Sequence, residues 1–210
     1  MGLSHRNTAC TSLALFLIPC YTSPTMRVIA GESKGRRLAG PKTIKIRPAL
    51  DAVREAIFNI LGNIRDTSVL DLFAGTGSVG IEALSRGAQK AIFIDHLQSA
   101  VFLIRKNLAL CHFENRAEVH KKGVSKALPL LSRRGLRFDL IFVDPPYDQD
   151  LVGPTLDQIS REKILAHEGW IVVEHSPRES INEIEGLCRL QSRQYGQTYI
   201  TFLQGSTLII

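Results

Sequence analysis

The sequence is poor in cysteine and has no long hydrophobic run. Its cysteines are far apart, without any C-x-x-C spacing: Cys10, Cys20, Cys111 and Cys188. This spacing argues against a zinc site or a disulfide framework and favours a reducing compartment, which we expect to be the cytoplasm. The apolar run from Leu13 to Ile18 is too short to span a bilayer. We therefore expect no metal and no membrane partner.

Internal repeats and low-complexity tracts are absent as well. The 210 residues leave room for one α/β domain with a sizeable core and a small appendage. Hydrophobic residues make up 44% of the chain, which argues against wholesale disorder. The net charge of +6 and a sequence pI of about 9.3 fit a polyanionic partner.

Residues 1–25 differ in composition from the rest. They contain no acidic residue, and His5 and Arg6 form a thin basic region before the apolar run. A signal peptide has this outline, and an organelle transit peptide is a second interpretation. We favour a third, an upstream start with the functional protein beginning at Met26, where a globular pattern begins. The chain then divides into an extension (1–25), a hairpin and helix (26–63) and a main domain (64–210).

The segment 26–47 is basic and interrupted by glycines. Short apolar alternations with glycines at the turns predict a small β-hairpin. The basic side chains either grip phosphate groups or form a merely solvated face, and charge alone leaves both open. Against one acid, Glu32, this segment has Arg27, Lys34, Arg36, Arg37, Lys42, Lys45 and Arg47.

A helix is predicted from Pro48 to Gly62, because apolar residues recur there at helical spacing and proline suits a first turn. Arg54 lies on or beside this helix. It either leans over a ligand or is an ordinary surface group.

The rest of the chain is organised around a glycine-rich turn. An apolar run, Val69 to Phe73, contains Asp71 and is followed by Gly75, Gly77 and Gly80. This pattern predicts a buried strand, a tight turn and a helix N-terminus, where glycines allow the backbone to approach a ligand.

The identity of that ligand is open at this point. The three glycines, with Asp95 twenty residues after Gly75, satisfy the dinucleotide fingerprint. Asp71, however, would repel a pyrophosphate and would attract a cation such as the amino group of S-adenosylmethionine (AdoMet). We favour AdoMet over NAD, and both over a turn without a ligand.

Further strands are predicted at 91–94 and 117–122, with helices at 98–110 and 125–131. Asp95 ends the second strand, where a carboxylate can accept both hydroxyls of a ribose. Gly123 and Val124 follow the third strand and are candidates for contact with an adenine ring.

The second decisive stretch is Asp144-Pro145-Pro146-Tyr147, which follows a predicted buried strand, Leu140 to Val143. An exocyclic base amine is a poor nucleophile, and the Asp144 carboxylate and Pro145 carbonyl can hold its N–H groups as it attacks a methyl group. Prolines fix φ and offer no competing N–H. Tyr147 provides a flat face for an extruded base. The spacing from the glycine turn fits three βα units, which argues against a plain rigid turn and against NAD.

The remaining chain predicts a helix over 151–165, a strand over 169–174 and a closing hairpin of 187–195 and 197–203. We interpret His175 as structural. Trp170, Tyr195 and Tyr199 are assigned to core or edge packing.

These stretches resemble class I AdoMet-dependent methyltransferases, specifically the bacterial 16S ribosomal RNA (guanine-N2) methyltransferases of the RsmD type. The resemblance runs from Met26 to about Gln204 and is carried by residues 26–31, 34–38, 47–55, 71–80 and 142–147.

The resemblance implies a Rossmann-like, seven-stranded, mostly parallel sheet with helices on both faces. It implies AdoMet as cofactor and methylation of a guanine N2 amine in 16S rRNA, within the small ribosomal subunit or an assembly intermediate. We expect a monomer. The residues to which it assigns RNA contact are Arg27, Lys34, Arg36, Arg37, Arg47 and Arg54. The cofactor-binding candidates are Asp71, Phe73, Gly75, Gly77, Gly80, Asp95, Gly123 and Val124, and the catalytic candidates are Asp144, Pro145, Pro146 and Tyr147.

The chain departs from the family pattern in three places. Ala49 and Ala52 stand where polar or basic groups are usual, Asp95 is shorter than the usual glutamate, and Gly123 lacks a polar side chain. Two rival functions stay open. One is a DNA amino-methyltransferase acting on adenine or cytosine, and the other is a non-catalytic RNA-binding assembly factor.

Overall fold

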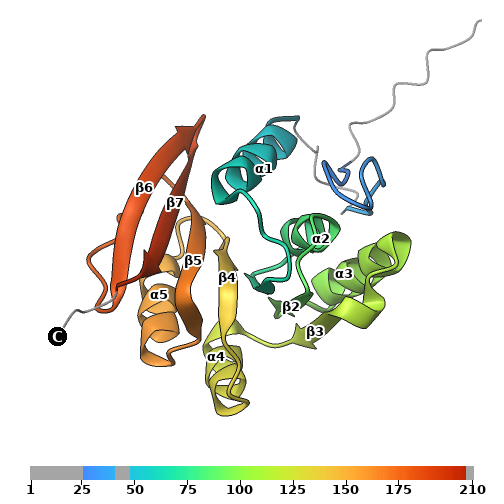
Figure 1. The fold of residues 1–210 in the computed structure, drawn as a ribbon. Coiled ribbons are helices and arrows are strands. Elements are labelled where there is room, and N and C mark those ends of the chain that lie inside the picture. The colour runs from blue at the N-terminus through green and yellow to red at the C-terminus, as the bar shows by residue number, and fades with distance from the viewer. Residues whose placement is uncertain (1–25, 41–47, 207–210) are drawn as a thin grey trace, which may run out of the picture.

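The computed structural model of the protein describes residues 26–40 and 48–206 (Figure 1). Within them one seven-stranded sheet has the order β3-β2-β1-β4-β5-β7-β6. The strands are β1 Ser68–Leu72, β2 Lys90–Asp95, β3 Ala117–Lys121, β4 Phe138–Val143, β5 Leu165–His175, β6 Leu187–Tyr195 and β7 Thr198–Gly205. The helices are α1 Pro48–Leu61, α2 Ser78–Ser85, α3 Gln98–Cys111, α4 Val124–Arg133 and α5 Val152–Arg161, with a 3-10 turn at Glu114–Arg116.

The sheet is parallel from β3 to β5, and β7 pairs antiparallel with both β5 and β6. From β1 the chain moves outward through β2 to β3, then returns to β4 on the other side of β1. The direction of strand addition therefore reverses between β1 and β4, where open α/β sheets bind their ligands. This confirms the predicted fold class.

Alternate residues of the buried strands face two separate helical layers. Val69, Phe93 and Phe142 belong to a core cluster on the side of α1, α2 and α3. Leu70 and Val143 belong to a second cluster on the side of α4 and α5. Figure 1 shows α2 and α3 on one side of the sheet and α4 and α5 on the other. The continuously apolar strands, typical of a parallel sheet, are thus buried on both faces.

Residues 26–40 form a tight turn against α2. The predicted hairpin is reduced there to one antiparallel bridge between Arg27 and Arg37, with Gly31 and Gly35 at positive φ in the turn. A Cβ atom added at Gly31 would lie 1.8 Å from the Ser85 carbonyl oxygen. Only glycine therefore allows this close approach to α2.

A buried carboxylate holds this turn in place. Glu82 in α2 is fully buried and accepts hydrogen bonds from the backbone N–H groups of Ile29 (2.7 Å) and Ala30 (3.0 Å). It also accepts one from Arg86 Nε (2.7 Å), and Arg54 Nε lies 3.8 Å away. Two guanidinium groups thus neutralise a carboxylate that burial would otherwise make very unfavourable.

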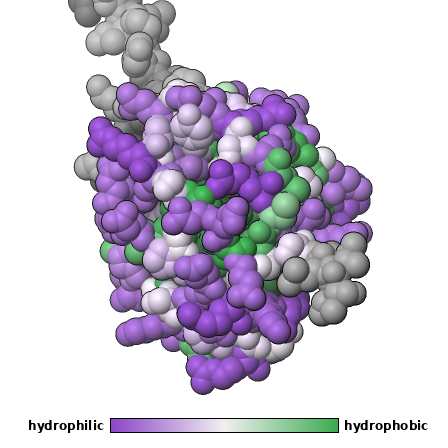
Figure 2. Space-filling model, turned by 90° about the vertical axis from the view of Figure 1, so that its left-hand side faces the viewer, coloured by the Kyte–Doolittle hydropathy of each residue, from purple (hydrophilic) through white to green (hydrophobic). Residues whose placement is uncertain are grey.

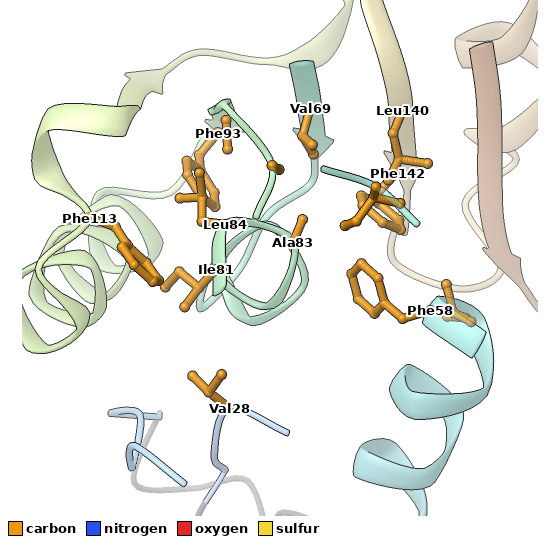
Figure 3. Close-up of a cluster of buried hydrophobic side chains, with 14 of the residues drawn as sticks. Val28, Phe58, Val69, Ile81, Ala83, Leu84, Phe93, Phe113, Leu140 and Phe142 are labelled. Atoms are coloured by element: carbon orange, nitrogen blue, oxygen red, sulfur yellow. The ribbon is translucent and has the colours of Figure 1, made fainter. Parts of the chain in front are cut away.

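Helix α1 is attached to the sheet through aromatic packing. Phe58 points toward Phe142 of β4 (Figure 3), with 5.8 Å between ring centroids and a 53° angle between the rings. The Arg86 guanidinium lies over the Phe58 ring, 4.7 Å from its centroid. Val28 and Ile81 of the same cluster also appear in Figure 3 and join residues 26–40 to α2.

The β6 edge of the sheet is largely exposed. Figure 2 views this side of the molecule and shows hydrophilic residues over most of it, with hydrophobic residues gathered towards the middle. Arg189 and Arg193 lie on this strand, and such charges discourage edge-to-edge pairing. None of the described helices has the length and apolarity needed to cross a membrane.

One predicted boundary is wrong. The helix expected to reach Leu165 ends at Arg161, and Leu165 is the first residue of β5. Lys163 adopts a left-handed conformation (φ 51°), which ends the helix. The Phe138 N–H then donates to the Ile164 carbonyl (2.8 Å), which draws the chain into the sheet four residues earlier than the apolar pattern indicated.

We expect Phe58→Ala to lower the free energy of unfolding by about 3–5 kcal/mol, because it removes the aromatic contact between α1 and the sheet and leaves a cavity. Asn59→Ala, at an exposed neighbour on the same helix, is the control and should change it by less than about 0.5 kcal/mol. Urea unfolding monitored by circular dichroism measures both. Equal losses in the two variants would contradict the proposed anchoring of α1.

Candidate active site

Three acidic residues come from neighbouring strands at the carboxyl edge of the sheet. Asp71 lies in β1, Asp144 directly follows β4, and Glu174 lies in β5. Each stands two residues after a strand residue of the α1–α2–α3 core cluster, so all three face that side. Together they line a pocket of ≈ 140 Å³, to which α1 contributes Ile57 and the glycine turn contributes Gly75.

Phe73 lies between this pocket and a second one, and it lines both. The second pocket has a volume of ≈ 260 Å³, and its lining includes Asp95, Gly123, Val124 and Pro146. Phe73 adopts φ 59°, an uncommon conformation for an aromatic residue, and such strain clusters at ligand sites. We refer to these two pockets, which share Phe73, as the two lobes of one cleft; each lobe is lined by at least one acidic residue.

Asp95 stabilises the turn that separates the lobes. Its Oδ2 accepts a hydrogen bond from the Gly75 N–H (2.9 Å), and its Oδ1 accepts one from the Leu97 N–H (2.8 Å). A carboxylate has about four lone-pair sites, so two remain for a ligand's hydroxyl groups. The residue therefore shapes the turn and retains capacity to bind.

The three glycines of the turn differ in what surrounds them. At Gly75 (φ 55°) the nearest atom to an added Cβ is the Phe73 carbonyl oxygen, at 3.9 Å, so this glycine is open to a ligand. At Gly80 an added Cβ would lie 2.4 Å from the Phe93 ring, and at Gly77 (φ 75°) it would lie 3.3 Å from Ile104. Gly77 and Gly80 line neither pocket. They allow the helix to pack closely on the sheet.

Burial, more than the repulsion between neighbouring carboxyl groups, governs the charge of the first pocket. Burial raises the pKa of Asp71 to about 7, opposed by a hydrogen bond from the Gly80 N–H (3.0 Å). Burial also raises the pKa of Glu174. Asp144 reaches solvent as a residue, yet its carboxyl group is surrounded by protein, and this burial followed by the charges of Glu174 and Asp71 raises its pKa well above the usual range. The pocket therefore favours a cation.

The loop after β4 presents the predicted catalytic residues in different ways. Pro145 is buried, whereas Pro146 and Tyr147 are exposed. The Tyr147 hydroxyl donates a hydrogen bond to Glu174 Oε1 (2.9 Å) and lies 2.5 Å from Thr198 Oγ1. Tyr147 as a whole is 42% exposed, which leaves part of its side chain open for stacking.

The predicted RNA-contacting residues are only partly on the surface. Lys34, Arg36 and Arg37 are exposed, and so is Arg27, whose Nε lies 3.7 Å from Asp51 Oδ2. Arg47 lies outside the described residues.

The prediction that Arg54 contacts RNA is wrong for the structure as described. Arg54 is buried, and its Nη2 donates to the Arg27 carbonyl (2.6 Å) and to Asp51 Oδ1 (3.0 Å). Helical spacing placed Arg54 on α1 correctly but did not reveal that residues 26–40 cover this part of the helix.

The basic segment lies next to the active-site turn. Asn107 in α3 is fully buried, and its Nδ2 donates to the carbonyls of Ala39 and Thr76 (2.9 Å each). Its Oδ1 accepts from the Ala39 N–H (2.7 Å). One side chain thus joins residues 26–40 to Thr76, which lines the first pocket.

Glu174 and Thr198 are not among the predicted site residues. The available signal was an acid at the end of the predicted strand 169–174, since carboxyl ends of parallel strands meet at one edge.

His175 is structural as predicted, because Nδ1 faces the carbonyls of Ser176 and Glu179 and Nε2 faces Thr201 Oγ1 (2.9 Å). Within the described ranges, no group of three or more His, Cys, Asp or Glu side chains could hold a metal ion.

Comparisons with known proteins show the family to which the chain belongs. A family model described as "Conserved hypothetical protein 95" matches residues 26–204. The chain is 38% identical over 175 residues to Bacillus subtilis YlbH, which bears a provisional name as an rRNA methyltransferase, covering 82% of this chain and 95% of that one. It is 37% identical over 153 residues to "Ribosomal RNA small subunit methyltransferase D" of Escherichia coli K12, covering 72% and 75%. A solved structure of Escherichia coli yhhF, provisionally named a methyltransferase, superposes with a TM-score of 0.75 at 30% identity, covering 87% and 99%.

We expect Asp71→Asn to stabilise the protein at alkaline pH. The folded state keeps the Asp71 proton up to about pH 7, whereas the unfolded chain releases it near pH 4, so the wild type loses stability as pH rises through this window. Asparagine stays neutral. The variant should therefore be more stable at pH 8 by roughly 1–4 kcal/mol and equal below pH 4.

Urea unfolding at pH 4, 6 and 8 measures this difference. Asp66→Asn, at an exposed turn, is the matched control and should show no such trend. A difference between Asp71→Asn and wild type that does not change with pH would refute the assigned role of burial.

Proposed function

The chain is an RsmD-type member of the Conserved hypothetical protein 95 family, and we propose that it transfers a methyl group from AdoMet to the exocyclic N2 amine of a guanine in 16S rRNA. The observation that carries the proposal is the position of the Asp144–Tyr147 loop. It leaves β4 at the reversal of strand order, beside the acidic two-lobed cleft.

The cleft fits AdoMet. The open approach at Gly75 and the two lobes on either side of Phe73 suit a ligand with an amino-acid part and a nucleoside part. The carboxyl group of Asp71 would attract the amino group, and the remaining lone pairs of Asp95 would accept the ribose hydroxyls. Gly123 and Val124 line the lobe where the adenine would lie. AdoMet supplies an electrophilic methyl group when bound.

The loop residues would hold the acceptor amine. The Asp144 carboxylate and the Pro145 carbonyl would accept its two N–H groups, which orients the nitrogen lone pair toward the methyl donor. Catalysis then rests on alignment and on electrostatic stabilisation of the positive charge that develops on nitrogen. Tyr147 would stack on the extruded base. The proton leaves the amine after the transfer, and Asp144 is placed to receive it.

The acceptor is argued from charge and from relatives. Two similar proteins are named for rRNA or for the small-subunit rRNA, and the exposed Lys34, Arg36 and Arg37 form a basic surface that Asn107 joins to the active-site turn. We place the enzyme, as a monomer, in the cytoplasm, acting on the small ribosomal subunit or an assembly intermediate. Guanine N2 as the acceptor is what the resemblance to the RsmD-type enzymes as a whole implies.

The proposal is tested with the full chain and AdoMet carrying a labelled methyl group. The acceptors are undermethylated small subunits, free 16S rRNA and duplex DNA, each digested to nucleosides. We expect label in N2-methylguanosine from the subunits, and a loss of about 100-fold or more in Asp144→Ala, because one of the groups that align the amine is removed. Asp157→Ala, an exposed acid on α5, is the control.

The outcomes separate the alternatives. Label in a methylated DNA base would assign the protein to the DNA amino-methyltransferases. AdoMet binding without transfer to any acceptor would favour the assembly factor.

We expect the double variant Arg36→Glu, Arg37→Glu to bind rRNA about tenfold or more weakly at 0.1 M salt, with a shallower dependence of affinity on salt, because two phosphate contacts are lost. AdoMet affinity should not change. Arg161→Glu with Lys163→Glu, exposed cations near the end of α5, is the matched control. Filter binding over a salt series measures both, and equal effects of the two double variants would argue against a specific RNA surface at residues 26–40.

A further inference from the structure

The Tyr147 hydroxyl is the tether of the catalytic loop. Among residues 144–150, all within the described chain, the side-chain hydrogen bonds are those of Tyr147 to Glu174 (2.9 Å) and with Thr198 (2.5 Å). Asp148 and Asp150 follow it in left-handed conformations, with φ 57° and 51°. A loop that includes two such residues needs fixed contacts to keep one conformation.

The tether joins three adjacent strands. Tyr147 follows β4, Glu174 lies in β5 and Thr198 begins β7, and these strands are neighbours in the sheet. A phenol has one hydrogen to donate. Because Tyr147 donates it to Glu174, the hydroxyl of Thr198 must donate to Tyr147. The phenol hydrogen is then used, and Tyr147 has no further hydrogen to donate to a substrate.

Glu174 also belongs to the acidic pocket. It lines the same ≈ 140 Å³ space as Asp71 and Asp144. The titratable groups that face Asp144 are Asp71 from β1, Glu174 from β5 and Tyr147 from its own loop. From α1, Ile57 lines the same pocket, and from β7, Thr198 contacts Tyr147; neither side chain titrates.

We propose that Glu174, assisted by Thr198, is a positioning residue that holds Tyr147 and thereby fixes the Asp144–Tyr147 loop in the geometry needed for methyl transfer. This inference rests on the proposed function. It assigns two separable roles to Glu174. The carboxylate accepts the hydrogen bond from the Tyr147 hydroxyl, and its negative charge acts on the neighbouring Asp144.

The electrostatic role of Glu174 predicts the direction in which the pKa of Asp144 changes when the Glu174 charge is removed. A negative neighbour raises the pKa of a carboxyl group, and Glu174 acts in this way on Asp144. Removing the Glu174 charge therefore lowers the pKa of Asp144, so that Asp144 stays ionised at more acidic pH. Because the pair is coupled, the acid limb of the rate profile reports both groups together.

The experiment compares the full-length wild type, Glu174→Gln, Thr198→Val and the control Glu168→Gln, which removes the same charge at the other end of β5. Glutamine can still accept from Tyr147 but carries no charge. Consider the acidic pH at which kcat/KM of the wild type has fallen to a tenth of its maximum. At that pH we expect kcat/KM of Glu174→Gln to be about three tenths of the variant's own maximum. Thr198→Val should leave the acid limb unchanged and lower kcat/KM by roughly 3- to 10-fold, the effect of one lost hydrogen bond.

A second readout does not depend on activity. The ¹³C carboxyl signal of Asp144, identified by its absence in Asp144→Asn, should titrate at lower pH in Glu174→Gln than in the wild type. An unchanged titration, or an equal change in Glu168→Gln, would overturn the electrostatic role of Glu174, and an unchanged kcat/KM in Thr198→Val would overturn the positioning role of the Tyr147 tether. Failure of the wild type to methylate any RNA would overturn the proposed function instead, and the NMR titration would still decide whether Glu174 acts on Asp144. A circular dichroism spectrum of each variant confirms folding.

Discussion

The structure depends on the parallel pairing of β4 beside β1, because this pairing brings acids that are far apart in the chain to one edge of the sheet. In register, Asp71 pairs with Phe142 and Val143 pairs with Val173. Asp144 and Glu174, which each follow this last pair by one residue, therefore stand side by side, two residues further along the sheet than Asp71. The same register places apolar side chains beneath them, which removes water and strengthens every charge interaction in the pocket.

The clustering of buried carboxyl groups at this edge lowers the stability of the folded state. Carboxyl groups that share a poorly solvated pocket repel one another, and the burial that raises the pKa of Asp71 to about 7 works against folding at neutral pH. A bound cation would relieve the repulsion. The acidic site is thus unfavourable for folding when no ligand is bound, as functional sites often are. The surrounding core and hydrogen bonds must keep it formed.

The buried carboxylate of Glu82 differs from those of the cleft, because its negative charge is compensated by neighbouring donors and cations. Glu82 is surrounded by donors, two from the backbone of residues 26–40 and one from Arg86, with Arg54 close by. It holds the basic segment on α2, while Asn107 joins that segment to the turn at Thr76. The basic segment and the glycine-rich turn are therefore supported by the same helices, α2 and α3.

The sequence by itself determined the fold class, most element boundaries and part of the cleft lining, because buried parallel strands leave continuous apolar runs and tight turns require glycine. It placed Asp71, Asp95 and Asp144 at strand ends, where the topology brings ligands. Only the tertiary structure decided that Arg54 is buried, that Gly80 faces Phe93, and that Tyr147 is held by Glu174 and Thr198. These facts depend on contacts between segments distant in the chain, and local periodicity carries no information about such contacts.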